Sequence, residues 1–218
     1  MNLLRIDASI QGPRSASSAL ADLVTAEFVA AQPGASLRTR HLGVEPLPAE
    51  LWPTAVGAAF TAQADRSPEQ SAAVARAREV ADELASADAV VLALPLYNWG
   101  VSQHVKTWID VAIAGAPTGT RLLDGTPTVL IATRGGGYGP GTPKEGWDHS
   151  IGYLRRIIGE VWGADLTVIE RELTLARVTP AMAGLVELAD AVQQQAEQAA
   201  VVAGRTLAAR VGDQAHAA

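Results

Sequence analysis

Three loops of this 218-residue sequence carry residues whose types and spacing could bind a ligand. The first, residues 8–18, is called the serine loop here because it holds Ser9, Ser15, Ser17 and Ser18 ahead of an amphipathic segment. Free backbone amides and the positive end of a helix favour an anion, and hydroxyls add further donors. The serine loop therefore predicts a phosphate site, although a helix cap would be a simpler explanation of Ser15 alone.

The second loop, residues 95–102, follows a continuous apolar segment and is called the aromatic loop. Tyr97 and Trp99 flank Asn98, and the packing of a core would not require all three residues at the end of a strand. The two rings could simply cover the edge of a sheet. The same segment could also place backbone amides and ring edges around a flat heteroaromatic ligand, so it is a second candidate binding segment.

The third loop, residues 133–141, contains five glycines among nine residues and is called the glycine loop. Glycine lets the backbone approach a ligand closely and permits positive φ angles, at a cost in chain entropy on folding. A flexible surface loop is the alternative explanation. The position of the glycine loop directly after an apolar strand favours ligand binding.

Motifs of several other enzyme classes are missing from the sequence. Neither GxxxxGK followed by Ser or Thr nor GxGxxG after the first strand is present, which argues against a nucleoside triphosphatase and a dinucleotide-binding fold. There is no GxSxG elbow and no HExxH, and the four histidines are dispersed, so no metal site is expected. The absence of cysteine excludes disulfides, thiolate metal sites and cysteine nucleophiles.

The charge and the amino-terminal segment restrict the expected partners. A formal net charge of −6 argues against binding a nucleic acid by bulk electrostatics. Residues 1–7 contain no basic segment followed by a long apolar run, and no other segment approaches the roughly 20 apolar residues of a membrane span. The lack of cysteine is compatible with a reducing compartment. We expect a cytoplasmic protein with neither a membrane nor a nucleic-acid partner.

Short apolar segments alternate with longer amphipathic ones, which predicts an α/β fold of repeated βαβ units. The predicted strands cover residues 3–7, 36–42, 87–94, 128–133 and 166–169. Helices are predicted over 67–86, 102–114 and 180–210, and around 151–158. Ser67 is the expected cap of the first of these, with Gln70 as its reciprocal partner. Residues 43–53 contain three prolines and are expected to form a loop.

Five strands joined by right-handed crossovers give a doubly wound parallel sheet with helices on both faces. Periodicity does not give the strand order. In the order 2-1-3-4-5, the carboxyl ends of strands one, three and four lie together, and these ends carry the three loops. We expect residues 1–211 to form a single domain and residues 212–218 a flexible tail.

The three loops together resemble those of the FMN-dependent NADH-azoreductase and NADH:quinone oxidoreductase family. The resemblance is carried by Ser9 with Ser15–Ser17, by Pro95–Trp99, by Thr133–Gly136, and by Ser102 with Lys106–Asp110. Three motifs at matching positions are far more specific than any one of them. Pro13 and Arg14 depart from the family pattern, as do the region of Trp52 and residues 137–147, so the acceptor substrate is left open.

The resemblance implies a flavodoxin-like fold with strand order 2-1-3-4-5. It also implies a homodimer with an FMN in each of two sites at the subunit interface. The serine loop matches the family's phosphate loop, and the other two loops match its isoalloxazine-edge segments. The implied cofactor-binding residues are Ser9, Ser15, Ala16, Ser17, Pro95, Leu96, Tyr97, Asn98, Trp99, Thr133, Arg134, Gly135 and Gly136.

The activity implied by the resemblance is transfer of a hydride from NADH or NADPH, through bound FMN, to a small acceptor such as a quinone or azo compound. Donor and acceptor would use one site in turn, a ping-pong mechanism, and no catalytic side chain is expected because flavin N5 carries the chemistry. Two alternatives keep the flavin: a flavodoxin-type electron carrier or flavin-binding regulator, and a biosynthetic flavin reductase acting on a specialised metabolite. Carriers usually have a Thr/Ser-x-Thr-Gly-x-Thr loop, which the serine loop does not match. A hydrolase or transferase without flavin lacks a visible nucleophile and base.

Overall fold

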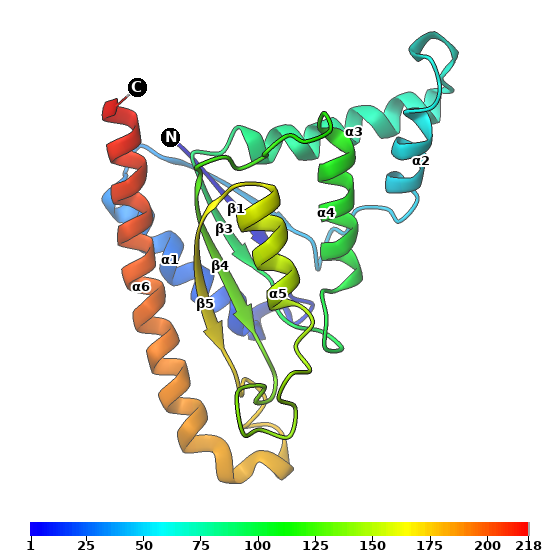
Figure 1. Ribbon diagram of the computed structural model, residues 1–218. Helices are drawn as coiled ribbons and strands as arrows, with labels where there is room; N and C mark the ends of the chain where they lie inside the picture. The colour runs from blue at the N-terminus through cyan, green and yellow to red at the C-terminus, as the bar shows by residue number, and fades with distance from the viewer. Residues whose placement is uncertain (218) are drawn as a thin grey trace.

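The computed structural model describes residues 1–217, with side chains through Asp213, and centres on one parallel β-sheet (Figure 1). Its strands are β1 (Asn2–Asp7), β2 (Ser36–His41), β3 (Ala89–Ala93), β4 (Pro127–Thr133) and β5 (Asp165–Arg171). They pair in the order β2-β1-β3-β4-β5, and every pairing is parallel. The expected fold class and strand order are confirmed.

Helices cover both faces of this sheet (Figure 1). They are α1 (Ala16–Ala31), α2 (Leu51–Ala58), α3 (Pro68–Ala85), α4 (Gln103–Gly115), α5 (Ile151–Leu154) and α6 (Val186–Ala217). One apolar core lies between the sheet and α1 with α6, and the other between the sheet and α3, α4 and α5. Strands β3 and β4 are buried at every position because both of their faces are covered, which explains their continuous apolar sequences.

Serine side chains begin three of the helices. Ser67 accepts a hydrogen bond from the Gln70 amide at 3.2 Å, and the Gln70 side chain accepts one from the Ser67 amide at 3.0 Å, so the expected capping box is confirmed. Ser15 caps α1 by accepting from the Ser18 amide at 3.1 Å. Ser102 caps α4 in the same way. These caps fix where α1 and α4 begin, next to the serine and aromatic loops.

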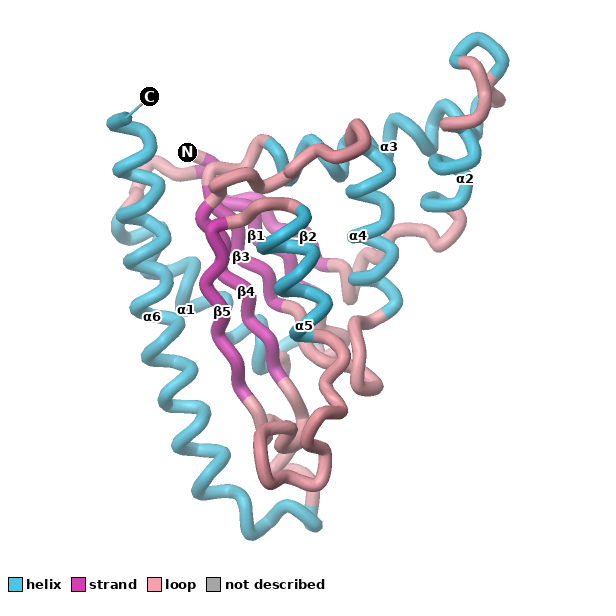
Figure 2. The backbone as a smooth tube through the Cα atoms, in the orientation of Figure 1, coloured by secondary structure: helices cyan, strands magenta, loops and turns pink. Residues whose placement is uncertain are grey.

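The expected loop over residues 43–53 is wrong for its last three residues, because α2 begins at Leu51. Pro53 lies in the first turn of α2. A proline there removes no intrahelical hydrogen bond, since the first amides of a helix have no acceptor within it. Helix α2 and the turn after it extend away from the sheet (Figure 2).

The carboxyl-terminal helix differs from the expectation at both ends. Pro180–Leu185 form a 3₁₀-helix, and a single continuous α-helix begins only at Val186. Helix α6 then continues to Ala217, through most of the segment expected to be a tail, while Ala218 lies outside the described residues. The helix expected around residues 151–158 is α5 in its first part, and residues 155–161 continue it as a π-helix. The flexibility of residues 212–218 stays a prediction.

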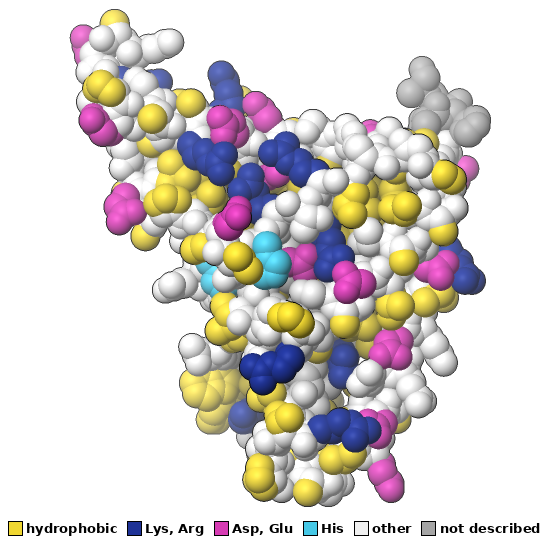
Figure 3. Space-filling view, turned by 180° about the vertical axis from the view of Figure 1, so that it is seen from behind, with side chains coloured by type: hydrophobic (Ala, Val, Ile, Leu, Met, Phe, Trp, Pro, Cys, Tyr) yellow, Lys and Arg dark blue, Asp and Glu magenta, His cyan; other side chains and the backbone are white. Residues whose placement is uncertain are grey.

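Charged side chains are mixed over the surface. Figure 3 shows Lys and Arg interspersed with Asp and Glu on the side of the molecule opposite to the view of Figure 1. At the β2 edge, Arg38 and Arg40 each contact the buried carboxylate of Glu83 at 2.7 Å. Among the described residues, none of the helices combines the length and the apolar composition needed to cross a membrane.

Candidate functional site

The three loops meet in one cavity at the carboxyl ends of the sheet strands. Its volume is about 380 Å³, which falls within the roughly 300–1,000 Å³ of small-molecule sites. The residues that line it are Ser9, Gln11, Arg14, Ala16, Ser17, Pro95, Leu96, Tyr97, Thr133, Gly135, Thr174, Leu175 and Val178. Five residues of the expected set are not among them: Ser15, Asn98, Trp99, Arg134 and Gly136.

The serine loop brings buried hydroxyls and the amino end of α1 to the cavity. Ser9 and Ser17 line it, and their exposed fractions are 2% and 1%. Ser15 does not line the cavity, because its hydroxyl caps α1 and contacts the Ser17 hydroxyl at 3.2 Å. The side chain of Ser15 thus has the structural role of a cap, while its neighbours Ala16 and Ser17 present the first turn of α1 to the cavity.

Two contacts hold the serine loop from behind. A Cβ atom at Gly43 would lie 2.2 Å from the carbonyl oxygen of Ser9, so any other residue at position 43 would displace the backbone there. His104, in the first turn of α4, places its Nε2 2.7 Å from the carbonyl oxygen of Ala8. The position of Ser9 therefore depends on the segment after β2 and on the start of α4. Neither contact is visible from the sequence, because the two partners are far apart in it.

The aromatic loop turns back on itself and fixes Tyr97 against the serine loop. Tyr97 and Gly100 exchange two backbone hydrogen bonds, of 3.2 and 3.0 Å, and both residues between them have positive φ, 48° at Asn98 and 63° at Trp99. This is the backbone of a tight hairpin turn of the primed type. The Tyr97 hydroxyl accepts a hydrogen bond from the Ile10 amide at 3.0 Å and lies 3.4 Å from the Ser9 hydroxyl.

The side chain of Trp99 lies outside the cavity lining and packs on a different loop. Its ring meets that of Trp147 edge to face, with ring centroids 5.9 Å apart. The carbonyl of Trp99 also accepts a hydrogen bond from the His149 amide at 2.9 Å. The aromatic loop is therefore joined to the segment that follows the glycine loop.

The glycine loop contributes backbone rather than side chains to the cavity. Thr133 and Gly135 line it, and the amides of Gly135 and Gly136 have no acceptor among the described residues. Both carbonyls are used, because that of Gly135 accepts from Leu175 at 3.1 Å and that of Gly136 accepts from Leu173 at 3.2 Å. Of these two amides, that of Gly135 belongs to a residue that lines the cavity, so it is a free donor suited to negative charge on a ligand.

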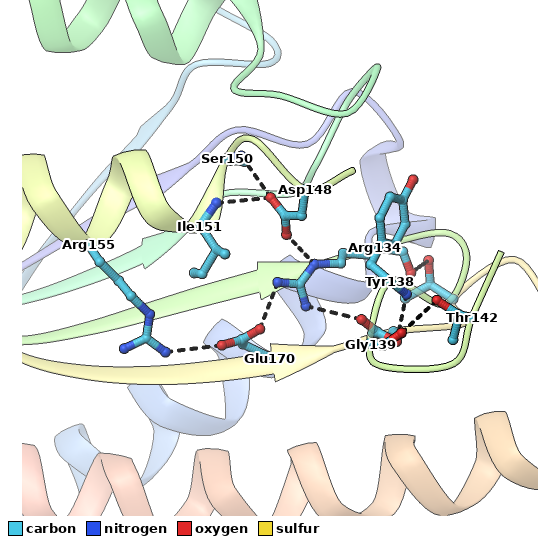
Figure 4. Close-up of polar contacts among 11 residues, drawn as sticks. Arg134, Tyr138, Gly139, Thr142, Asp148, Ser150, Ile151, Arg155 and Glu170 are labelled. Carbon is cyan, nitrogen blue, oxygen red and sulfur yellow. Dashed lines mark hydrogen bonds and ion pairs between the residues drawn. The ribbon is translucent and has the colours of Figure 1, made fainter. Parts of the chain in front are cut away.

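The side chain of Arg134 does not line the cavity and points toward a group of carboxylates (Figure 4). It contacts Asp148 and Glu170 in hydrogen bonds and lies 3.6 Å from Glu172. Burial alone lowers the pKa of Arg134, but the bonds from Glu170 and Asp148 outweigh it and hold that pKa above its ordinary value. Arg134 is therefore charged throughout the accessible pH range.

The pKa values of Asp148 and Glu170 are set by the same two opposing effects, burial and nearby hydrogen-bond donors. Burial raises the pKa of Asp148, but the amides of Ile151 and Ser150 and the guanidinium of Arg134 outweigh it, so the pKa lies below its ordinary value. Burial likewise raises the pKa of Glu170, while Arg134 and then Arg155 lower it further than burial raises it. Both side chains are ionised at neutral pH.

Sequence reasoning missed five of the residues that line the cavity. Gln11 and Arg14 lie within the serine loop but were not chosen. Thr174, Leu175 and Val178 belong to the segment after β5. The strand order contains the signal that could have found this segment. β5 neighbours β4 in parallel, so its carboxyl end must reach the same edge of the sheet as the glycine loop.

Comparison with known proteins gives consistent matches over most of the chain. The family model described as "Flavodoxin-like fold" matches residues 1–202. The FMN-dependent NADH:quinone oxidoreductase of Frankia alni is 36% identical over 203 residues, covering 91% of this chain and 96% of that protein. The protein of the same description from Streptomyces avermitilis is 35% identical over 212 residues, covering 95% and 97%.

Solved structures share the fold. An azoreductase from Bacillus anthracis str. Sterne has a TM-score of 0.75 at 20% identity, covering 94% of this chain and 99% of that one. An FMN-dependent NADH-azoreductase from Bacillus anthracis str. Ames Ancestor, solved in complex with FMN, has a TM-score of 0.71 at 18% identity, covering 91% and 97%. With the family model and the relatives at 34–36% identity, the chain belongs to the flavodoxin-like fold family and, within it, to the family of the FMN-dependent NADH:quinone oxidoreductases.

Proposed function

We propose that this chain is an FMN-dependent oxidoreductase that passes a hydride from NADH or NADPH to a small acceptor such as a quinone or azo compound. The observation that carries the proposal is the cavity itself. It joins a hydroxyl-rich helix start, at Ser9 and Ser17, to the edges of two loops that present mainly backbone and one aromatic ring. Its relatives are described as FMN-dependent NADH:quinone oxidoreductases.

The residues present fit FMN but not a larger flavin cofactor such as FAD. The phosphate would be held by the Ser9 and Ser17 hydroxyls and by the first amides of α1, which have no intrahelical acceptor. Pro95–Tyr97 and the free amide of Gly135 would border the ring system. No second phosphate-binding motif follows the serine loop in the sequence, so FAD is not expected.

FMN, when bound, supplies the redox chemistry by taking up and releasing a hydride at its ring. The chain's residues supply position and electrostatics. The free amide of Gly135 would stabilise negative charge at the ring edge. Tyr97 is held by Ile10 and so keeps the aromatic loop at a fixed distance from the serine loop. No catalytic side chain is required, and donor and acceptor occupy one cavity in turn.

We further propose that the working form is a homodimer in the cytoplasm. Large apolar side chains around the cavity are exposed to solvent in one subunit, including Ile10, Trp99, Trp147 and Val178, with exposed fractions from 44% to 74%. Apolar groups concentrated around one site mark an interaction surface. A second copy packed over this rim would cover them and complete the walls of the cavity.

The proposal is tested on the purified full-length protein. We expect a yellow protein, with a released cofactor of the mass of FMN at one per chain, and bleaching of its visible absorbance when NADH is added without oxygen. Recovery of stoichiometric FAD would refute the cofactor. A protein that binds FMN but is not bleached by NADH or NADPH would instead be an electron carrier or a flavin-binding regulator, and a colourless protein unable to bind FMN would be neither.

A further inference from the structure

Arg134 stands in the sequence between two residues that line the cavity, but its own side chain does not line it. Thr133 and Gly135 both line the cavity. The Arg134 side chain is 5% exposed and turns into the protein, toward Asp148, Glu170 and Glu172. Because the side chain of Arg134 does not line the cavity, its three carboxylate partners indicate its role.

The three carboxylates come from two separate segments. Asp148 lies just before α5, and its other oxygen accepts from the amides of Ser150 and Ile151 at 2.7 and 3.0 Å (Figure 4). Glu170 lies on β5 and Glu172 just after it, and Glu172 also accepts from the Tyr138 amide at 3.1 Å. One guanidinium thus joins the end of β4, the start of α5 and the end of β5, and we call these four side chains the Arg134 cluster.

The segment after β5 forms the part of the cavity wall next to the glycine loop. Thr174 and Leu175 line the cavity, and both are tied to the glycine loop by backbone hydrogen bonds, from the Thr174 amide to the Arg134 carbonyl and from the Leu175 amide to the Gly135 carbonyl, each 3.1 Å long. Between Glu172 and Thr174, Leu173 has a φ of 60°, a backbone conformation that a leucine adopts only when its surroundings impose it. The contact of Glu172 with Arg134 and the backbone hydrogen bonds of Leu173 and Thr174 to the glycine loop supply that constraint.

We propose that Arg134 is a positioning residue: its side chain holds both the glycine loop and the segment after β5 in the geometry that receives the flavin ring. It acts through the backbone of Gly135, Gly136 and Thr174 and does not touch the cofactor. This differs from the direct cofactor contact implied for Arg134 by the family motif. The inference rests on the proposed function for the identity of the ligand, whereas the geometry of the Arg134 cluster is given by the hydrogen bonds and ion pairs described above.

Arginine is suited to this role and lysine is not. The Arg134 side chain uses Nε for Asp148 and Nη2 for Glu170, and Nη1 faces Glu172, so three different nitrogens of one planar group point at three carboxylates. A lysine ammonium is a single point of charge on a flexible stem and cannot hold three separate segments in fixed directions. Replacement by lysine therefore keeps the positive charge that faces the three carboxylates but loses the geometry of the guanidinium.

The test compares Arg134→Lys and Arg134→Gln with a matched control, Arg205→Gln. Arg205 pairs with Glu27 at 2.8 Å between α6 and α1, exposed and outside the cavity lining. Three quantities are measured on full-length protein: the dissociation constant of FMN from fluorescence titration, the absorption spectrum of bound FMN, and hydrogen exchange of residues 133–147 and 172–178. Far-UV circular dichroism checks that each variant is folded.

In Arg134→Lys, we expect native circular dichroism, an FMN dissociation constant raised at least tenfold, a shifted flavin absorption band, and faster exchange in both segments. Arg134→Gln should show larger changes, and Arg205→Gln should stay within twofold of the wild type. Wild-type affinity and spectrum in Arg134→Lys would overturn the proposal. If the wild type itself binds no FMN, the proposed function fails, and the exchange of residues 172–178 still decides the cluster, since unchanged exchange in Arg134→Lys would overturn it.

Discussion

The serine loop and the glycine loop border the same cavity but are built in opposite ways. The serine loop presents two side chains, Ser9 and Ser17, and its internal hydrogen bonds join residues at most three positions apart, although Gly43 and His104 also support it from distant parts of the sequence. The glycine loop presents backbone amides, and its position depends on partners at Asp148 and Glu170, 14 and 36 residues away in the sequence. The first site can therefore be recognised from a short segment, whereas the second requires the folded sheet.

The largest expected effect comes from adding charge to the serine loop. Ser17→Asp places a carboxylate beside the expected phosphate, and two unit charges about 5 Å apart repel by roughly 3 kcal/mol at an effective dielectric constant of about 20. We expect FMN affinity to fall more than a hundredfold, measured by fluorescence titration. Ser71→Asp, at an exposed position on α3, is the control. Equal affinity in Ser17→Asp and the wild type would place the phosphate elsewhere.

The second-largest expected effect comes from disturbing the contact between Gly43 and the serine loop. In Gly43→Ala, the new Cβ would lie 2.2 Å from the Ser9 carbonyl oxygen and must displace the backbone. Overpacking of this kind costs about 1–3 kcal/mol, so we expect a lower unfolding free energy and roughly tenfold weaker FMN binding. Gly57→Ala is the control, because no atom lies within 4 Å of its added Cβ. Full FMN affinity in Gly43→Ala would show that Ser9 does not need this support.

A smaller effect is expected where the aromatic loop meets the serine loop. Tyr97→Phe removes the hydroxyl that accepts from the Ile10 amide. A neutral hydrogen bond contributes about 0.5–1.5 kcal/mol, so FMN affinity should fall roughly two- to tenfold while the unfolding temperature changes little. A Tyr97→Phe variant that binds FMN as tightly as the wild type would show that this contact does not position the aromatic loop.

The smallest expected effect is a pH dependence on the glycine-loop side. The pKa values of Asp148 and Glu170 are lowered in the folded protein, so the stability they contribute is fully present above their unfolded values and is lost as pH falls through their folded ones. The unfolding free energy of the wild type should therefore decrease below about pH 4 more steeply than that of Arg134→Gln, in which these carboxylates have lost their partner. Urea denaturation at a series of pH values measures the unfolding free energy. An equally steep decrease in the wild type and in Arg134→Gln would show that Arg134 does not stabilise the ionised forms of Asp148 and Glu170.

The contrast between local and distant contacts also explains which elements of the fold could be predicted from the sequence. Apolar segments such as β3 and β4, and local signals such as the Ser67–Gln70 box, predict elements correctly because their causes lie within a few residues. The loop over 43–53 was partly wrong because a proline in a first helical turn looks like a helix breaker from the sequence alone. Proline is informative only when its position in the element is known.

The residues of the candidate site also separate into those that could be predicted from short motifs and those that could not. The hydroxyls of Ser9 and Ser17 and the ring of Tyr97 could be assigned from short motifs, and each lines the cavity. The contribution of Thr174, Leu175 and Val178 could not, because nothing in that segment marks it as a binding segment until β5 is paired with β4. The role of the Arg134 side chain was equally hidden, since its partners are defined only by the fold.

The kinetic order tests the shared cavity most directly. With FMN bound in the cavity, one face of the flavin ring between the aromatic and glycine loops can hold one planar partner at a time within transfer distance. NADH must then leave before the acceptor enters. Initial rates against NADH at several fixed quinone concentrations should give parallel double-reciprocal lines, and NADH should bleach the bound flavin in the absence of both oxygen and acceptor. Intersecting lines, together with no bleaching until the acceptor is added, would contradict a single site used in turn.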